Sequence, residues 1–222
     1  MSKILELLFP SRCVICNSPG IQLCALCSSS ITPSFRKAEI TGLELCAGAL
    51  YGDVVSQLIL MAKEENIAAA RNVLVDLLVD AYVKLDMRGV GNQKISLIPI
   101  PSSQSANRKR GYRHSYLLAQ GVRERFRRDG NMQIEIAEVL KVNRKISDMS
   151  TLTKEQRATN ISQAYSINPR GRAGEAEGKV LILLDDLVTT GSSMMEAVRC
   201  LRAAKMWPLG AISAGVSPHL IS

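Results

Sequence analysis

The segment of residues 180–193, VLILLDDLVTTGSS, constrains the fold of this chain more than any other part. Its apolar run has no polar alternation, which is typical of a parallel strand covered on both faces. The run leads into the adjacent acids Asp185 and Asp186, a short loop of small residues, and a helix-compatible stretch over residues 194–205. Ligands of open α/β sheets bind outside the carboxyl ends of such strands. We therefore predict a strand, loop and helix unit with a ligand site at the loop.

The loop and the two acids indicate different halves of one ligand. Backbone N–H groups of a tight loop and the amino end of a helix bind phosphate, and Gly191 lets the backbone approach closely. Adjacent carboxylates would repel a phosphate unless they bind ribose hydroxyls or a hydrated cation. A sugar that carries a 5-phosphate satisfies both halves. A helix capped by Thr190 or Ser192 is the alternative, but it explains neither the paired acids nor the two adjacent threonines.

The same motif resembles the 5-phosphoribosyl 1-pyrophosphate (PRPP) site of type I phosphoribosyltransferases. The resemblance implies that PRPP binds together with Mg2+ across the strand ends. It assigns PRPP binding to Asp185, Asp186, Thr189, Thr190, Gly191, Ser192 and Ser193.

Two cysteine pairs near the start of the chain form a metal-binding pattern. Cys13 and Cys16 make one C-x-x-C, and Cys24 and Cys27 make the next after seven residues. Four thiolates suit a closed, structural Zn2+ site, and the ion would supply folding energy that so short a segment lacks. Disulfides and a thioredoxin-like redox site are the alternatives. The remaining cysteines, Cys46 and Cys200, are expected to be buried as small apolar residues.

Length and composition are those of a globular protein. The 222 residues, 46% of them hydrophobic and 22% charged, fit one domain with a small appendage. No apolar stretch is long enough to span a bilayer. The first ten residues, MSKILELLFP, are short for a signal peptide and contain Glu6. We therefore expect a cytoplasmic protein without membrane insertion.

The net charge of +8 is unevenly distributed. Residues 1–92 hold 8 Lys and Arg against 9 Asp and Glu, whereas residues 93–222 hold 20 against 11. Such an excess suits a polyanion, either pyrophosphate or nucleic acid or both; a solvated helix face is the alternative for residues 123–128. The excess is concentrated in Arg108, Lys109, Arg110, Arg113, Arg123, Arg125, Arg127 and Arg128.

Periodicity predicts alternating strands and helices. Helices are expected at residues 4–9, 53–63 with Asp53 as N-cap, 67–85, 112–128 and 194–205. Strands are expected at 45–50, 94–100, 134–142, 162–167, in the main motif and at 211–216, and a loop or helix at 145–159. This order predicts an α/β fold with a parallel sheet flanked by helices. We expect a zinc-ribbon-like head over residues 1–44 and a phosphoribosyltransferase-like domain over residues 45–222.

The order of these motifs resembles the ComF family of bacterial proteins over nearly the full length. The resemblance implies a type I phosphoribosyltransferase-like fold with a four-cysteine zinc head, and a link to DNA uptake in natural competence. It places residues 99–103 at a strained pyrophosphate loop, where a non-proline cis bond is common. It makes Ser102, Arg110 and Lys63 pyrophosphate contacts, and it places Leu152, Arg157 and Asn160 in a downstream pattern.

The chain departs from the family near the mouth of the expected site. Arg113 and His114 stand where the family usually has Asn-Gln, and Met149 stands at a common glutamine. His114 is the nearest candidate for an acid or base, but one histidine in a basic loop is expected at the surface, and His219 is also expected to be exposed. The earliest cysteine, Cys13, belongs to the metal pattern, so the sequence contains no glutaminase nucleophile.

Two functions are consistent with this sequence. The first is a phosphoribosyltransferase, in which a nitrogen acceptor displaces pyrophosphate from PRPP through positioning and charge stabilisation. The second is a non-catalytic module that senses PRPP or a nucleotide and binds single-stranded DNA or a helicase-like partner. Tyr112 and Tyr116, among Arg110, Arg113 and Arg123, are then the best stacking residues in a chain of few aromatics.

Overall fold

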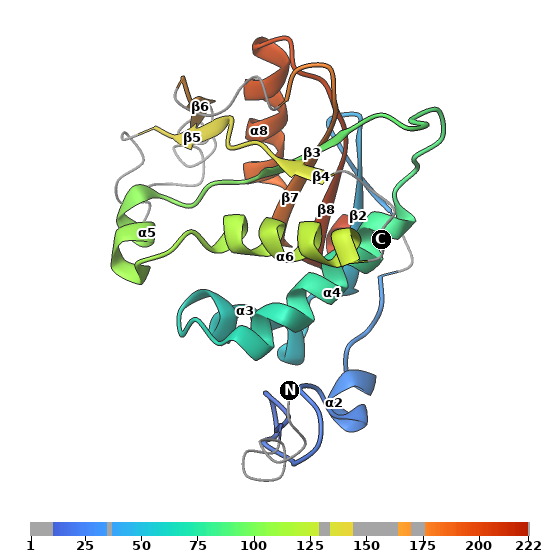
Figure 1. Ribbon diagram of the computed structural model, residues 1–222, viewed down its shortest axis with the longest axis vertical. Coiled ribbons are helices and arrows are strands. Elements are labelled where there is room, and N and C mark those ends of the chain that lie inside the picture. Colours follow the sequence, from blue (N-terminus) through green and yellow to red (C-terminus); the bar gives the residue numbers. More distant parts are fainter. Residues whose placement is uncertain (1–10, 35–36, 129–133, 144–163, 170–175, 222) are drawn as a thin grey trace.

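A six-stranded, mostly parallel sheet forms the centre of the computed structural model, which describes residues 11–34, 37–128, 134–143, 164–169 and 176–221. The strand order is β1-β2-β8-β7-β3-β4 (Figure 1). Only the edge strand β1 is antiparallel to its neighbour. The strands are β1 (Ala38–Ile40), β2 (Leu43–Leu50), β3 (Ile95–Pro99), β4 (Ile134–Ile136), β7 (Val180–Val188) and β8 (Pro208–Val216). The expected α/β class with a largely parallel sheet is confirmed.

Helices cover both faces of this sheet. One face carries α3 (Asp53–Lys63), α4 (Ala68–Lys84) and α6 (His114–Arg128), and the other carries α8 (Ser192–Ala203) (Figure 1). The central strand β7 contributes to both cores, because Ile182 and Leu184 pack under α3, α4 and α6 while Leu181 and Leu183 pack under α8. Burial on both faces explains the unbroken apolar run of this strand.

Two short elements differ from the sequence-based expectations. The single strand expected at residues 134–142 is two strands, because β4 ends at Ile136 and β5 (Leu140–Val142) pairs antiparallel with β6 (Tyr165–Ile167) in a separate small sheet. The Ala137 N–H, just after β4, still donates to the Leu97 carbonyl of β3 at 2.9 Å. Beyond this hydrogen bond the chain diverges from β3. The seven-residue helix α5 (Gln104–Arg110) was not expected from periodicity; Ser103 caps its start, and Gly111, at φ 78°, ends it.

The cysteine-rich segment packs beside α4. It contains the short helix α2 (Ala25–Ser29), and Val14, Ile15, Leu23 and Ile31 contact the core on the α4 side of the sheet. Backbone hydrogen bonds connect the segment to β2: the Leu50 N–H donates to the Thr32 carbonyl, and the Ser34 N–H donates to the Gly48 carbonyl. Strand β1 and the first two residues of β2 precede the expected boundary at residue 45, yet they belong to the six-stranded sheet.

The C-terminal part of the described chain is a 3-10 turn, η3 (Pro218–Leu220), after β8. His219 in this turn is exposed, as expected. Within the described ranges, none of the helices has the length and apolar character needed to cross a membrane.

Candidate functional site

The carboxyl end of β7 is the meeting point of three elements. Asp186 is only 4% exposed, and its Oδ2 lies 2.7 Å from Nζ of Lys63 at the end of α3. His114 Nε2, at the start of α6, lies 3.4 Å from the same oxygen. The structure thus brings together Lys63 and Asp186, both predicted site residues, and adds the buried His114 beside them.

The expectation of a surface position for His114 is wrong, because its side chain is fully buried. Its neighbours on α6 explain this burial: Leu118 and Val122 follow at intervals of four and are also fully buried. This helical spacing would have placed His114 on the buried face, but the basic residues around it concealed the pattern. Among the described residues neither ring nitrogen of His114 has a partner with hydrogen-bond geometry.

The two adjacent acids have opposite electrostatic environments. Burial alone would raise the pKa of Asp186, but His114 and Lys63 outweigh it, so this pKa lies below its usual value. Burial, followed by the charge of Asp186, holds the pKa of Asp185 well above its usual value. The Asp185 Oδ1 also accepts the Asp186 backbone N–H at 2.9 Å. Asp186 therefore retains its negative charge, whereas Asp185 resists ionisation.

The loop of residues 189–193 follows directly and opens α8. Gly191 is the N-cap of α8 with φ 75°. This is a left-handed backbone conformation that residues other than glycine adopt at a cost in free energy. Thr190 Oγ1 and Ser192 Oγ lie 2.9 Å apart, and Thr189, Thr190 and Ser193 are exposed. The alternative in which Thr190 or Ser192 is the N-cap of the helix does not match the structure. The N-cap position of α8 is occupied by Gly191, and no side chain makes a cap hydrogen bond there.

The expected pyrophosphate segment, residues 99–103, follows the neighbouring strand β3, which ends at Pro99. The Ile100 N–H donates to the Leu184 carbonyl at 2.9 Å, so this segment runs beside β7. Ser102 is half-buried, and Ser103 accepts the Ala106 N–H at 3.2 Å. The expected cis bond is absent, since every peptide bond in the described part of the chain is trans.

Both cations expected to bind pyrophosphate are held by carboxylates. Arg110 Nη2 lies 2.9 Å from Glu64 Oε1, and the Arg110 side chain is 11% exposed. Lys63, the residue before Glu64, is held by Asp186, and the Tyr112 hydroxyl donates to the Lys63 carbonyl at 2.7 Å. The end of α3 therefore joins the end of α5 to the end of β7.

Tyr165 is a residue near this site that sequence analysis did not single out. It lies in β6 and is buried, and burial followed by the charge of Asp185 raises its pKa to about 12, against a hydrogen bond with Ser193. A lone tyrosine in a three-residue strand carries no motif that would have identified it. The predicted residues Met149, Leu152, Arg157 and Asn160, and the stretches 4–9 and 145–159, lie outside the described residues.

A second candidate centre is formed by the four N-terminal cysteines. The Sγ atoms of Cys13, Cys16, Cys24 and Cys27 all lie within 4.8 Å of one another, and Cys16 and Cys24 are 3.6 Å apart. Tetrahedral zinc with Zn–S bonds of about 2.3 Å places its sulfurs roughly 3.8 Å apart, so the geometry fits. The cluster could hold a metal ion, and all six cysteines are unpaired. Cys46 and Cys200 are buried, as expected.

Hydrogen bonds prepare part of this cluster for thiolates. Backbone N–H groups of Cys16 and then Cys24 lower the pKa of Cys13 to about 6, and the Cys24 N–H lies 3.4 Å from the Cys13 sulfur. Burial, followed by the neighbouring thiols, raises the pKa of Cys27 to about 12. A raised pKa means that forming the Cys27 thiolate costs free energy, and a bound cation would offset this cost.

Comparison of the chain with protein-family models gave no matching family, and comparison with curated proteins gave no matching sequence.

Proposed function

We propose that this chain is a phosphoribosyltransferase-like protein of the ComF type that binds PRPP with Mg2+ at the carboxyl ends of β7 and β3. The observation that carries the proposal is the grouping of Lys63, His114 and Asp186 directly before the glycine loop that opens α8. Paired acids, a nearby cation and a phosphate-sized loop are the three parts that a phosphorylated sugar with a pyrophosphate group requires.

Each part of PRPP has a binding element in this proposal. The loop of residues 189–193 binds the 5-phosphate through its backbone N–H groups and hydroxyls. Asp185 and Asp186 bind the ribose hydroxyls. Ser102, Arg110 and Lys63 bind pyrophosphate, and Mg2+, when bound, neutralises part of the pyrophosphate charge.

Binding requires an exchange of partners. Lys63 must leave Asp186 and Arg110 must leave Glu64, because both cations are paired with carboxylates. Pyrophosphate oxygens then replace the carboxylates, and the two cations lie at the ends of α3 and α5 before the ligand arrives. An acceptor nitrogen then displaces pyrophosphate at C1, with catalysis from positioning and from stabilisation of the leaving group.

The cysteine cluster is proposed to hold structural Zn2+. Four sulfur ligands leave no open coordination position, which is typical of a structural rather than a catalytic site. The segment packs against α4 through a few apolar side chains, so the ion would fix its local fold.

The alternative is a non-catalytic module that senses PRPP or a nucleotide and binds single-stranded DNA or a helicase-like partner. Arg123 and Lys141, which have no ion pair among the described residues and line the same pocket as Tyr116, favour it. Two contacts weaken it: the Tyr112 hydroxyl is bonded to α3, and the Arg113 guanidinium lies 4.4 Å from the centre of the Tyr116 ring. Both tyrosines expected to stack on bases are therefore already engaged.

Calorimetric titration with PRPP and Mg2+ tests the first proposal. The zinc-loaded wild type is compared with the Asp185→Asn/Asp186→Asn variant and with Asp80→Asn, an exposed acid on α4. Binding by the wild type and Asp80→Asn that the double variant lacks would support the site. No binding by folded wild-type protein would exclude PRPP as the ligand. Release of pyrophosphate that depends on an added nitrogen acceptor would separate the enzyme from the sensing module.

A further inference from the structure

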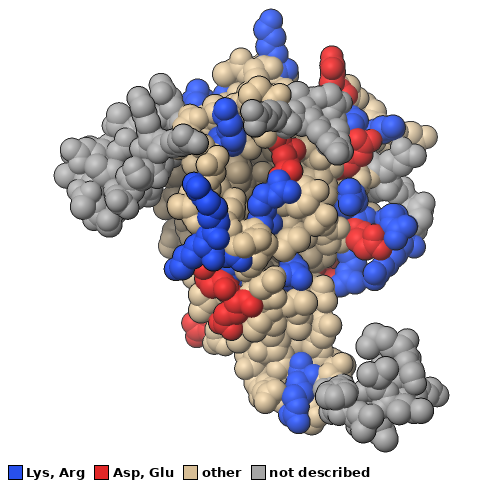
Figure 2. Space-filling model, turned by 60° about the vertical axis from the view of Figure 1, so that its left-hand side comes forward, with Lys and Arg blue, Asp and Glu red and all other residues tan. Residues whose placement is uncertain are grey.

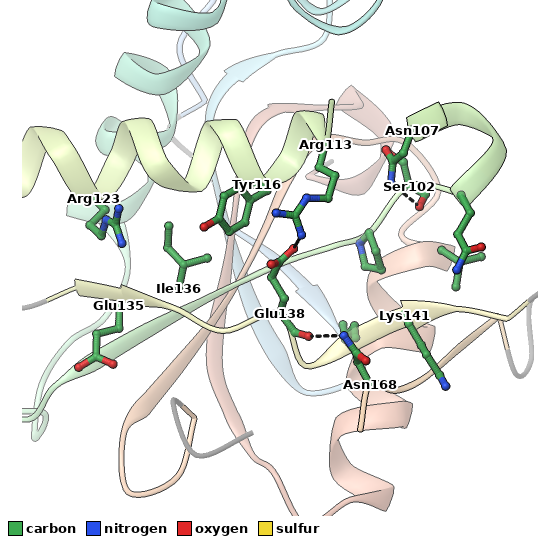
Figure 3. Close-up of a pocket in the computed structure, with 14 residues that line it drawn as sticks. Ser102, Asn107, Arg113, Tyr116, Arg123, Glu135, Ile136, Glu138, Lys141 and Asn168 are labelled. Carbon is green, nitrogen blue, oxygen red and sulfur yellow. Dashed lines mark hydrogen bonds and ion pairs between the residues drawn. The ribbon is translucent and has the colours of Figure 1, made fainter. Parts of the chain in front are cut away.

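A second polar pocket, of about 610 Å3, lies outside the strand-end site just described. It is bounded by the loop after β3, by α5 and α6, and by β4, β5 and the end of β6 (Figure 3). We call it the α6–β5 pocket. The lining side chains that matter for its chemistry are Asn107, Arg113, Tyr116, Arg123, Glu138 and Lys141.

The charges of this pocket include two cations that have no ion pair among the described residues. Its two carboxylates are neutralised, because Glu138 pairs with Arg113, and Glu135 lies 2.6 Å from Lys179 Nζ. In the described part of the chain, neither Arg123 nor Lys141 has an ion pair. The pocket is therefore positive on balance and suits an anionic ligand. Lys and Arg side chains are also prominent on the body of the molecule in the view of Figure 2.

The pocket also has groups that suit a planar, hydrogen-bonding ring. The side chains of Gln104, Asn107 and Asn168 line the end near α5 and β6. Asn107 Nδ2 donates to the Ser102 carbonyl and Asn168 Nδ2 to the Glu138 carbonyl. The exposed Gln104 carboxamide offers a ligand both a donor and an acceptor. Asn107 Oδ1 is buried and lacks a donor among the described residues. A buried acceptor of this kind costs free energy, which rotation of the Asn107 carboxamide toward a donor from a ligand would recover.

The polar groups are spread along the pocket. In Figure 3, Tyr116 and Arg123 extend from α6 at one end, Asn107, Asn168 and Lys141 lie toward the other, and Arg113 lies between them. Arg113 stacks on the Tyr116 ring and points to Glu138. A guanidinium held in this way offers a flat surface for a base.

We propose that the α6–β5 pocket binds a mononucleotide, with its phosphate at Arg123 and its base at the carboxamide end. The site borders the proposed phosphoribosyl site, with which it shares Pro101 and Ser102 of the segment after β3. The proposal stands whether or not PRPP binds at β7. Lys141 adds a second cation beside the ligand.

Titration of the intact, zinc-loaded protein with AMP tests this proposal. Arg123→Ala is the main variant, and Arg127→Ala is its matched control, because Arg127 lies one turn further along α6, is paired with Glu124 and does not line the pocket. Loss of a charge-assisted contact is expected to weaken AMP binding about tenfold or more in Arg123→Ala. Arg127→Ala should bind AMP like the wild type.

Three further titrations identify the site and the form of the ligand. AMP binding that survives in Asp185→Asn/Asp186→Asn supports a separate pocket, whereas loss of AMP binding there would place the nucleotide at β7 and overturn the proposal. Ribose 5-phosphate should bind to the double variant at least about tenfold more weakly than AMP, because it lacks the base. A single-stranded oligonucleotide that binds through Arg123 when AMP does not would overturn the proposal in favour of a nucleic-acid surface. No AMP binding at millimolar concentration, or an unchanged affinity in Arg123→Ala, would also overturn it.

Discussion

Lys63 Nζ and Asp186 Oδ2 lie 2.7 Å apart, although 123 positions separate the two residues in the sequence. The contact joins the end of α3 to the end of β7 in a region where Asp186 is almost fully buried. His114 shares the same oxygen from a third element, α6. This buried carboxylate therefore joins three elements in one place, at the centre of the proposed PRPP site.

Replacing Lys63 should destabilise the protein and weaken PRPP binding together. Lys63→Met leaves Asp186 buried beside His114 alone, and loss of one partner of a buried pair costs about 2–4 kcal/mol when one group is partly exposed. Urea denaturation measures the change. The control is Lys37→Met, whose pair with Glu44 is more exposed and contributes under about 1 kcal/mol. Equal effects of the two substitutions would contradict the assigned role of Lys63.

The adjacent acids should respond in opposite ways to removal of their charge. Asp186→Asn should destabilise the protein at pH 7, because a carboxyl with a lowered folded pKa contributes stability above its unfolded pKa of about 4. Asp185→Asn should stabilise it, because ionising a carboxyl with a raised pKa costs stability above that raised pKa. Each change should amount to about 1 kcal/mol or more, the equivalent of one pKa unit.

Acidification should reduce both differences. The benefit of Asp186 disappears as the pH falls from about 4 toward its folded pKa, and the cost of Asp185 disappears as the pH falls through its raised pKa to about 4. Denaturation midpoints from pH 8 to pH 3 measure this, with Asp80→Asn as an exposed control. A shift of the same sign for Asp185→Asn and Asp186→Asn would show that their environments are alike.

Glu64→Gln should tighten the binding of pyrophosphate and PRPP. Glu64 holds Arg110 at 2.9 Å and so competes with the ligand for this cation. Releasing a partly exposed pair should improve affinity about threefold to tenfold. The matched control is Glu65→Gln, which removes the same charge from an exposed neighbour. If both variants gain the same affinity for pyrophosphate, the cause is the change in net charge and not competition for Arg110. This prediction rests on the proposed PRPP site.

Gly191→Ala should cost both stability and phosphate binding. Alanine at φ 75° costs about 1–2 kcal/mol, and its Cβ would lie 3.1 Å from Ile40 Cδ1. Gly111→Ala is the control, since Gly111 has φ 78° but no atom near the added Cβ. Gly111→Ala therefore reports the backbone cost alone. Calorimetry with PRPP should show weaker binding only for Gly191→Ala; unchanged binding would remove the loop from the site.

Removal of metal should affect the cysteine cluster and spare the sheet. Elemental analysis should find one zinc ion per chain, and Cys16→Ser or Cys24→Ser should lose it because four thiolates complete the site. Cys46→Ser, in β2 and outside the cluster, should retain zinc. Far-ultraviolet circular dichroism should report an intact sheet in the metal-free protein. Zinc retained by the Cys16 and Cys24 variants would contradict the cluster as the binding site.

Sequence patterns predicted most of what depends on neighbours along the chain. The strand of residues 180–188, the helices of residues 53–63 and 67–85, and the two cysteine pairs all follow from local spacing, since periodicity reports which face of an element is buried. The structure places these elements within a few residues of the expected bounds. The close approach of four sulfurs also follows from spacing, because a short segment can bring two C-x-x-C pairs together.

Tertiary structure alone decided how distant residues meet. The packing of α3, α5 and α6 on the strands decides three features: the burial of His114, the ion pair of Glu64 with Arg110, and the division of residues 134–142 between two sheets. Such contacts join segments whose separation carries no local pattern, so propensity and spacing do not encode them. The sequence by itself determined the strand, glycine loop and helix of residues 180–203 and the cysteine cluster, whereas packing determined which charges surround Asp186, because a pKa depends on the groups that folding brings close and on the water that folding removes.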